Sequence, residues 1–69
     1  MIKYKIDIMK ALKQKGYTSY KLRQEKIFGE ATLTKFRKQE SMNFDNLDKL
    51  CYLLNCQPGD IIEHVNEYD

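Results

Sequence analysis

The sequence has few of the residues that support small folds through covalent bonds or metal ions. Its 69 residues include two cysteines, Cys51 and Cys56, and one histidine, His64. The cysteines do not form a CxxC motif and His64 has no second ligand at a metal-binding spacing, so no metal site is predicted. We expect both cysteines to be small apolar core residues in a reducing compartment. No cofactor is expected.

The sequence also lacks the patterns of membrane, secreted and catalytic proteins. No stretch approaches the roughly 20 apolar residues of a membrane-spanning helix, and the first residues lack the apolar run of a secretory signal. We therefore expect a cytoplasmic protein. There is no Ser-His-Asp set, glycine-rich phosphate loop or HExxH motif, and Asp45 and Asp48 form a pair of a kind common on helix surfaces. The sequence predicts that the protein is not an enzyme.

The residues that are present predict one small domain with an uneven charge distribution. A 42% apolar content is enough for a single core over residues 1–69. This length is near the lower limit for domains that fold without disulfides or metal ions. Residues 1–40 carry eleven Lys or Arg and four Asp or Glu, a net of +7. Residues 41–69 carry one and six, a net of −5, so the whole chain is +2. This polarity favours a face that binds a polyanion, although an asymmetric solvated surface is the alternative.

Apolar spacing and capping residues predict an all-α fold of five short helices. We place them at about 8–15, 19–26, 30–38, 44–54 and 58–65. The expected N-terminal caps are Asp7, Thr18 or Ser19, and Asn43, and the expected stops are Gly16 and Asn55. Pro58 suits the first position of the last helix, with Ile61, Ile62 and Val65 packing inward.

Residues 1–6 alternate apolar and charged side chains, which is typical of an extended segment. We expect a short N-terminal arm. It either frays or pairs with a symmetry mate.

The second and third helices form the most informative stretch. Their apolar positions point inward across a tight turn, namely Leu22, Ile27, Phe28, Leu33 and Phe36. This is the layout of a helix-turn-helix, whose second helix enters the major groove of DNA. We also assign the aromatic residues Tyr17, Phe28, Phe36 and Phe44 to the core rather than to a stacking platform for single strands.

The opposite face of the third helix carries hydrogen-bonding side chains. One contiguous stripe contains Glu30, Ala31, Thr34, Lys35 and Lys38. Lys35 can reach guanine O6 and N7, and Glu30 can accept a hydrogen bond from cytosine N4. Thr34 can donate or accept a hydrogen bond, or touch a thymine methyl group. The alternative is an ordinary solvated helix face.

Residues 7–65 resemble the Xre or Cro-repressor type of helix-turn-helix, which has the lambda-repressor-like fold of five helices. More narrowly, the segment Asn46-Leu-Asp-Lys-Leu-Cys-Tyr-Leu-Leu-Asn-Cys-Gln-Pro-Gly-Asp-Ile-Ile62 is similar to the helix 4 and 5 signature of minimal stand-alone regulators of Gram-positive bacteria and mobile elements. The resemblance implies that Ser19 and Tyr20 contact phosphates and that the bases are faced by Glu30, Ala31, Thr34 and Lys35. It also implies that Arg37, Lys38 and Asn43 grip the flanking backbone.

Two residues depart from the family pattern. Arg23 stands where a small alanine is usual, and Ile27 stands where the turn usually has glycine. A β-branched residue resists positive φ. We therefore expect Gly29 to adopt the unusual dihedral angle, with a changed tilt of the third helix.

We interpret the sequence as a repressor that binds double-stranded DNA as a homodimer, on half-sites about one helical turn apart. The candidate dimer surfaces are the arm with Ile2, Tyr4 and Ile6, or the last helix with Ile62 and Val65. The alternative is a protein-interaction adaptor, antitoxin or inhibitor on the same fold without a specific operator.

Overall fold

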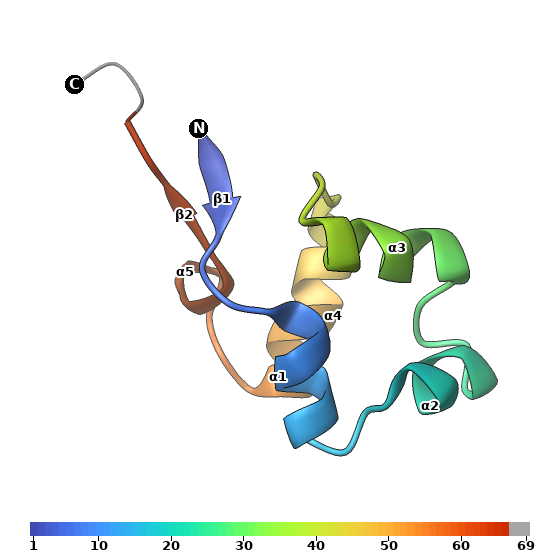
Figure 1. Cartoon of the computed structure of the whole chain (residues 1–69). Coiled ribbons are helices and arrows are strands. Elements are labelled where there is room, and N and C mark those ends of the chain that lie inside the picture. The colour runs from blue at the N-terminus through green and yellow to red at the C-terminus, as the bar shows by residue number, and fades with distance from the viewer. Residues whose placement is uncertain (67–69) are drawn as a thin grey trace.

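The computed structural model describes residues 1–66 and shows five helices and a two-stranded ribbon (Figure 1). In chain order the elements are β1 (Ile2–Tyr4), α1 (Ile8–Gln14), α2 (Ser19–Gln24), α3 (Glu30–Lys38), α4 (Phe44–Leu54), α5 (Pro58–Ile61) and β2 (Ile62–His64). α1 and α4 lie at the centre of the molecule, with α2 and α3 on one side and the ribbon and α5 on the other. The expected single domain also includes residues 67–69, which lie outside the described residues.

Three of the helices begin at the caps predicted from the sequence. Asp7 accepts the backbone N–H of Lys10 at 3.1 Å, which starts α1. Thr18 accepts that of Lys21 at 3.2 Å and begins α2, and Asn43 accepts that of Asn46 at 2.8 Å and begins α4. Each side chain satisfies an N–H that has no partner within its helix.

The ends of the first four helices share one geometry. The residue after each helix or its cap has a positive φ: Gly16 at 91°, Lys26 at 56°, Gln39 at 57° and Asn55 at 53°. The following N–H then bonds back to a carbonyl five residues earlier, from Tyr17 to Leu12, Ile27 to Leu22, Glu40 to Lys35 and Cys56 to Cys51. This is the Schellman pattern, which satisfies carbonyls left open at a helix end. The predicted stops at Gly16 and Asn55 are confirmed.

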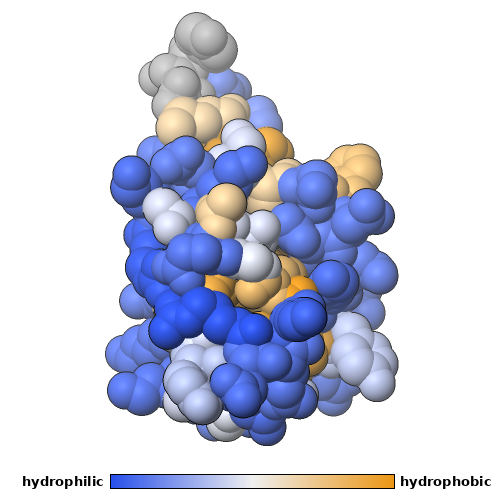
Figure 2. Space-filling view, turned by 90° about the vertical axis from the view of Figure 1, so that its right-hand side faces the viewer, coloured by the Kyte–Doolittle hydropathy of each residue, from blue (hydrophilic) through white to orange (hydrophobic). Residues whose placement is uncertain are grey.

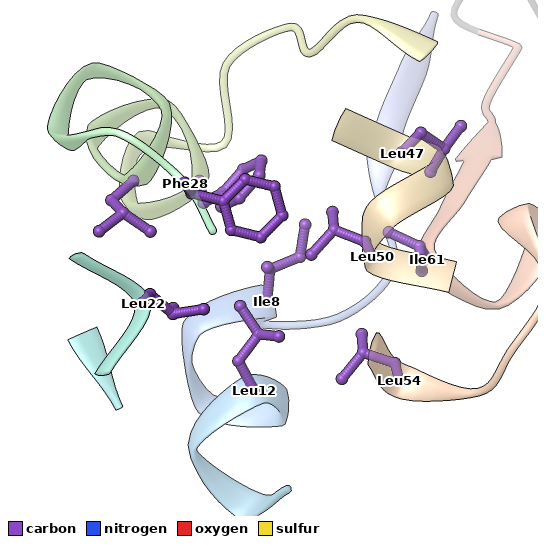
Figure 3. Packing of buried hydrophobic residues seen from close by; sticks show 10 residues of the cluster. Ile8, Leu12, Leu22, Phe28, Leu47, Leu50, Leu54 and Ile61 are labelled. Atoms are coloured by element: carbon purple, nitrogen blue, oxygen red, sulfur yellow. The ribbon is translucent and has the colours of Figure 1, made fainter. Parts of the chain in front are cut away.

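The core is built from one or more residues of every helix (Figure 3). Its buried members are Ile8, Leu12, Leu22, Phe28, Leu33, Phe36, Leu47, Leu50, Leu54 and Ile61. The predicted inward positions are therefore confirmed for most of the chain, and the half-buried Cys51 and Cys56 pack against this cluster as free thiols. Phe44 is the exception among the four aromatic residues assigned to the core, because it is 85% exposed at the first position of α4.

The prediction of an all-α fold with a helix over 58–65 was wrong in its last part. α5 ends at Ile61, and residues Ile62–His64 form β2, which pairs antiparallel with β1 in the register Ile2 with His64 and Tyr4 with Ile62. Ile62 is β-branched and fits a pleated strand well, and Val65 lies one residue beyond the end of β2. Because Ile62 and Val65 are not helical, the predicted dimer surface on a last helix does not exist as such.

The predicted extended N-terminal arm is present as β1, but the expectation that it frays or pairs with a symmetry mate was wrong, because its partner is β2 of the same chain. The Met1 ammonium group donates to the Val65 carbonyl at 2.8 Å, and the Lys5 N–H donates to that of Ile61 at 2.7 Å. The Tyr4 hydroxyl donates to the carbonyl of Glu40, just beyond α3. Burial, and then the nearby Glu40 carboxylate, raise the pKa of Tyr4. The ribbon is thereby attached to the end of α3.

Candidate nucleic-acid interface

The turn between α2 and α3 fixes how α3 is presented. Lys26 takes the positive φ of this turn, while Gly29 has a φ of −74° and serves as the N-terminal cap of α3. The prediction that Gly29 adopts the unusual dihedral was therefore wrong. Any residue tolerates the φ of Gly29, and a Cβ built there meets nothing within 4 Å. Ile27 sits one residue after the left-handed position, so its β-branch is not strained.

A lysine from α4 holds this turn in place. The Lys49 ammonium group donates to the carbonyl of Ile27 at 3.2 Å and lies 5.7 Å from the centre of the Phe28 ring. A cation over an aromatic face is attractive. Lys49 therefore links the turn to α4 by two contacts, and it is the single Lys or Arg of residues 41–69.

The inner face of α3 is anchored in the core. Leu33 is fully buried and Phe36 nearly so, and the Phe36 ring meets Phe28 edge-to-face with a centroid distance of 5.0 Å. α3 also packs against α1. Its orientation is thus determined by buried contacts on one side, which leaves the other side free for a ligand.

The outer face of α3 lies open. Ala31, Lys35 and Lys38 are exposed and Thr34 is half-buried. Figure 2 shows the side of the molecule on which α2 and α3 lie: it is mostly hydrophilic, with a small apolar area near its middle. The stripe predicted from the sequence is therefore accessible at these four residues.

Glu30 differs from the rest of the stripe because its carboxylate is already engaged. Oε2 accepts from Arg23 Nη1 at 3.0 Å and Oε1 accepts from Arg37 Nη1 at 3.2 Å. These two hydrogen bonds hold the pKa of the Glu30 carboxyl below its usual value, and the bond from Arg23 has the larger effect. The two ion pairs connect α2 to both ends of α3 on the flank that faces α2.

The residues expected to contact the DNA backbone lie at the ends of three helices. Ser19 is half-buried and Tyr20 is exposed in the first turn of α2. Arg37 and Lys38 are exposed in the last turn of α3, and Asn43 is exposed, with its side-chain oxygen capping α4. The structure brings Arg37 into contact with Glu30, so residues assigned to two different roles in fact share one ion-pair network.

Sequence reasoning missed the contacts that Arg23 and Lys49 make with α3 and with the turn before it. Arg23 was noted only as a departure from the family pattern. Glu30 and Arg37 are seven residues apart, which places them on one helix face, so their pairing was predictable. The approach of Arg23 and Lys49 depends on tertiary packing and has no sequence signal of its own.

Other kinds of site find no support among residues 1–66. Within this range, no three His, Cys, Asp or Glu residues come together in a way that would hold a metal ion. None of the helices described has the length and apolar character needed to cross a bilayer.

Comparisons with known proteins identify the family of the chain. Residues 7–67 match the Cro/C1-type HTH DNA-binding domain. The chain is 30% identical over 64 residues to the uncharacterized HTH-type transcriptional regulator YozG of Bacillus subtilis, covering 93% of this chain and 76% of YozG. It is also 46% identical over 33 residues to a proline–tRNA ligase of Cyanothece sp., but that match spans 48% of this chain and only 5% of the ligase. No solved structure matches the chain.

Proposed function

The chain belongs to the family of Cro/C1-type HTH DNA-binding domains, which makes it a DNA-binding transcription regulator, and we propose that it acts as a repressor by inserting α3 into the major groove of an operator. The observation that carries this proposal is the two-sided character of α3. Leu33 and Phe36 hold it from beneath, while the edge with Lys35 is open. Bound over a promoter, the protein excludes polymerase sterically. We place it in the cytoplasm, with the chromosome of a bacterial host.

Base reading is assigned to the middle of the open edge. Lys35 has the reach and the donors to contact guanine O6 and N7, and Thr34 offers a hydroxyl and a methyl group. Ala31 is small and permits close approach of the helix to the base edges. Glu30, the fourth residue expected here, has its carboxylate held by two arginines.

Backbone contacts are assigned to residues at the ends of three helices. Ser19 and Tyr20 begin α2, Arg37 and Lys38 end α3, and Asn43 caps the start of α4. Such contacts fix the position of the protein on the duplex without choosing a sequence.

We assign the working form to a homodimer. A single domain of this size buries about 600–1,000 Å² on DNA, so two copies on adjacent half-sites gain affinity that one lacks. Of the candidate residues on the arm, Ile2 is exposed, whereas Tyr4 and Ile6 are half-buried against the core. Met1 and Phe44 add exposed apolar surface along the groove that Ile2 also lines. Sedimentation of the protein on duplexes with one and two half-sites tests this assignment, which requires two copies on the longer site.

A salt titration on duplex DNA separates this function from an adaptor on the same fold. A repressor shows log K falling linearly with log salt, with a slope that counts the phosphates contacted, and a marked preference for one sequence. Arg37→Ala should weaken binding to all duplexes similarly and reduce the slope by about one. Weak binding without preference for any sequence would instead favour a protein-interaction adaptor, antitoxin or inhibitor.

A further inference from the structure

One cluster of charged side chains joins Arg37 and Glu30 to Arg23, which has no function assigned so far. Arg23 from α2 and Arg37 from the last turn of α3 each bind a different oxygen of the Glu30 carboxylate, at 3.0 and 3.2 Å. The side chains are 45%, 41% and 58% exposed, in the order Arg23, Arg37 and Glu30. The cluster lies on the flank of α3 next to the edge assigned to base reading.

This cluster is expected to contribute little to the stability of the fold. Ion pairs between exposed side chains contribute little to folding, because water and salt screen them. Two guanidinium groups on a single carboxylate also leave one net positive charge and bring two cations close together. A second anion at the cluster would balance that charge.

The guanidinium groups have donors available for such an anion. Each carries five N–H donors in a planar fork, and Glu30 binds a single nitrogen, Nη1, of each. The fork matches phosphate oxygens well, and holding the side chain in advance reduces the entropy lost on binding. The anion that lies beside a helix in the major groove is a phosphate of the duplex backbone.

We propose that Glu30 is a positioning residue that holds Arg23 and Arg37 as a pair for one phosphate of the DNA backbone. This inference rests on the proposed function, and it adds Arg23 to the interface. It gives Glu30 a role other than base reading: the carboxylate determines where the two arginines lie, and these determine the register of α3 in the groove.

Replacing single phosphates by neutral methylphosphonates tests the pairing. The probe is a duplex selected from random sequences by the wild-type protein, with each backbone position replaced in turn. We expect one position at which the change weakens wild-type binding about tenfold, the value of one charged hydrogen bond. Arg23→Ala and Arg37→Ala should each bind more weakly and become insensitive to that same position, to within about twofold. Arg23→Lys should keep the charge and still lose most of the sensitivity, because the fork is gone.

Lys21→Ala is the matched control. Lys21 also lies on α2 and pairs with a carboxylate, that of Glu25 at 3.9 Å, so its loss removes the same charge from the same helix. This variant should keep the full dependence on the phosphate. A position-specific dependence that survives in Arg23→Ala would overturn the pairing.

Glu30→Gln tests the positioning role. This variant keeps both arginines but no longer holds them in place. The loss of affinity on methylphosphonate replacement should therefore become smaller at the critical phosphate and appear at neighbouring phosphates as well. Affinity for random duplexes should not fall, because a negative charge has been removed from a DNA-binding face. A variant with the wild-type phosphate profile would show that Glu30 positions nothing. Absence of any preferred duplex for the wild-type protein would contradict the proposed function itself, which is a different result.

Discussion

Comparing Lys26→Gly with Lys26→Ala measures the backbone strain of the α2–α3 turn, because both variants lose the contacts of the lysine side chain. Lys26 has a φ of 56°, a left-handed conformation that costs a residue with a Cβ about 1–2 kcal/mol. Glycine avoids that cost but loses about 0.4–1 kcal/mol through the greater freedom of its unfolded chain. Lys26→Gly should therefore be more stable than Lys26→Ala by about 1 kcal/mol, which corresponds to about 4–8 °C in Tm for a domain of this size.

The comparison is made by thermal and urea unfolding followed by circular dichroism. The same two substitutions at Asp48, an exposed residue in the middle of α4, provide the control. There alanine should be the more stable variant by about 1 kcal/mol, because glycine is unfavourable inside a helix. If alanine were the better residue at both positions, the turn would not contain a left-handed Lys26, and our account of how α3 is presented would fail.

Three further substitutions test neighbouring parts of the account. Gly29→Ser should stabilise the fold by about 0.5–1 kcal/mol, because Gly29 has a negative φ and caps α3 without a side chain; a loss of Tm would place the strained residue there instead. Tyr4→Phe should cost about 0.5–1.5 kcal/mol through the lost hydrogen bond to Glu40. Since the pKa of Tyr4 is raised in the fold, this difference should be complete below pH 10.0 and vanish as the pH rises through the folded-state pKa, which urea unfolding at several pH values would show. The pKa of Glu30 is lowered, so its exposed ion pairs should stabilise the wild type slightly over Glu30→Gln above pH 4.5, and this small difference should disappear as the pH falls through the folded-state pKa; a difference that widens in acid would contradict the ion pairs.

Local signals in the sequence predicted the helices and most of the core. The caps Asp7, Thr18 and Asn43 act through hydrogen bonds to residues three positions away, so their effect can be inferred from the sequence without a fold. The apolar spacing of Leu47, Leu50 and Leu54 directly determines which face of α4 is buried.

The ribbon could not be predicted in this way. Ile61, Ile62 and Val65 have a spacing compatible with a helix, and the pairing that makes 62–64 a strand involves β1, at the other end of the sequence. Sequence periodicity carries no information about such a distant partner. The same limit explains Phe44, whose apolar character suggested burial but whose place at the start of α4 leaves it exposed.

The candidate site was predictable as a stripe and not as a network. The outward positions of Lys35 and Lys38 follow from helix geometry, and the structure leaves both exposed. The partners of Glu30 depend on the angle at which α2 meets α3. That angle is set by a turn in which Lys26, and not the expected Gly29, has the positive φ.

Selection of bound duplexes from a random pool, performed in parallel with the wild-type protein and Lys35→Ala, tests most directly whether the open edge of α3 reads bases. We expect the wild type to enrich one motif and the variant to enrich the same motif with the preference relaxed at a single base pair, at a cost of about 1–3 kcal/mol in affinity. An unchanged motif for Lys35→Ala, or no enrichment by the wild type, would contradict it.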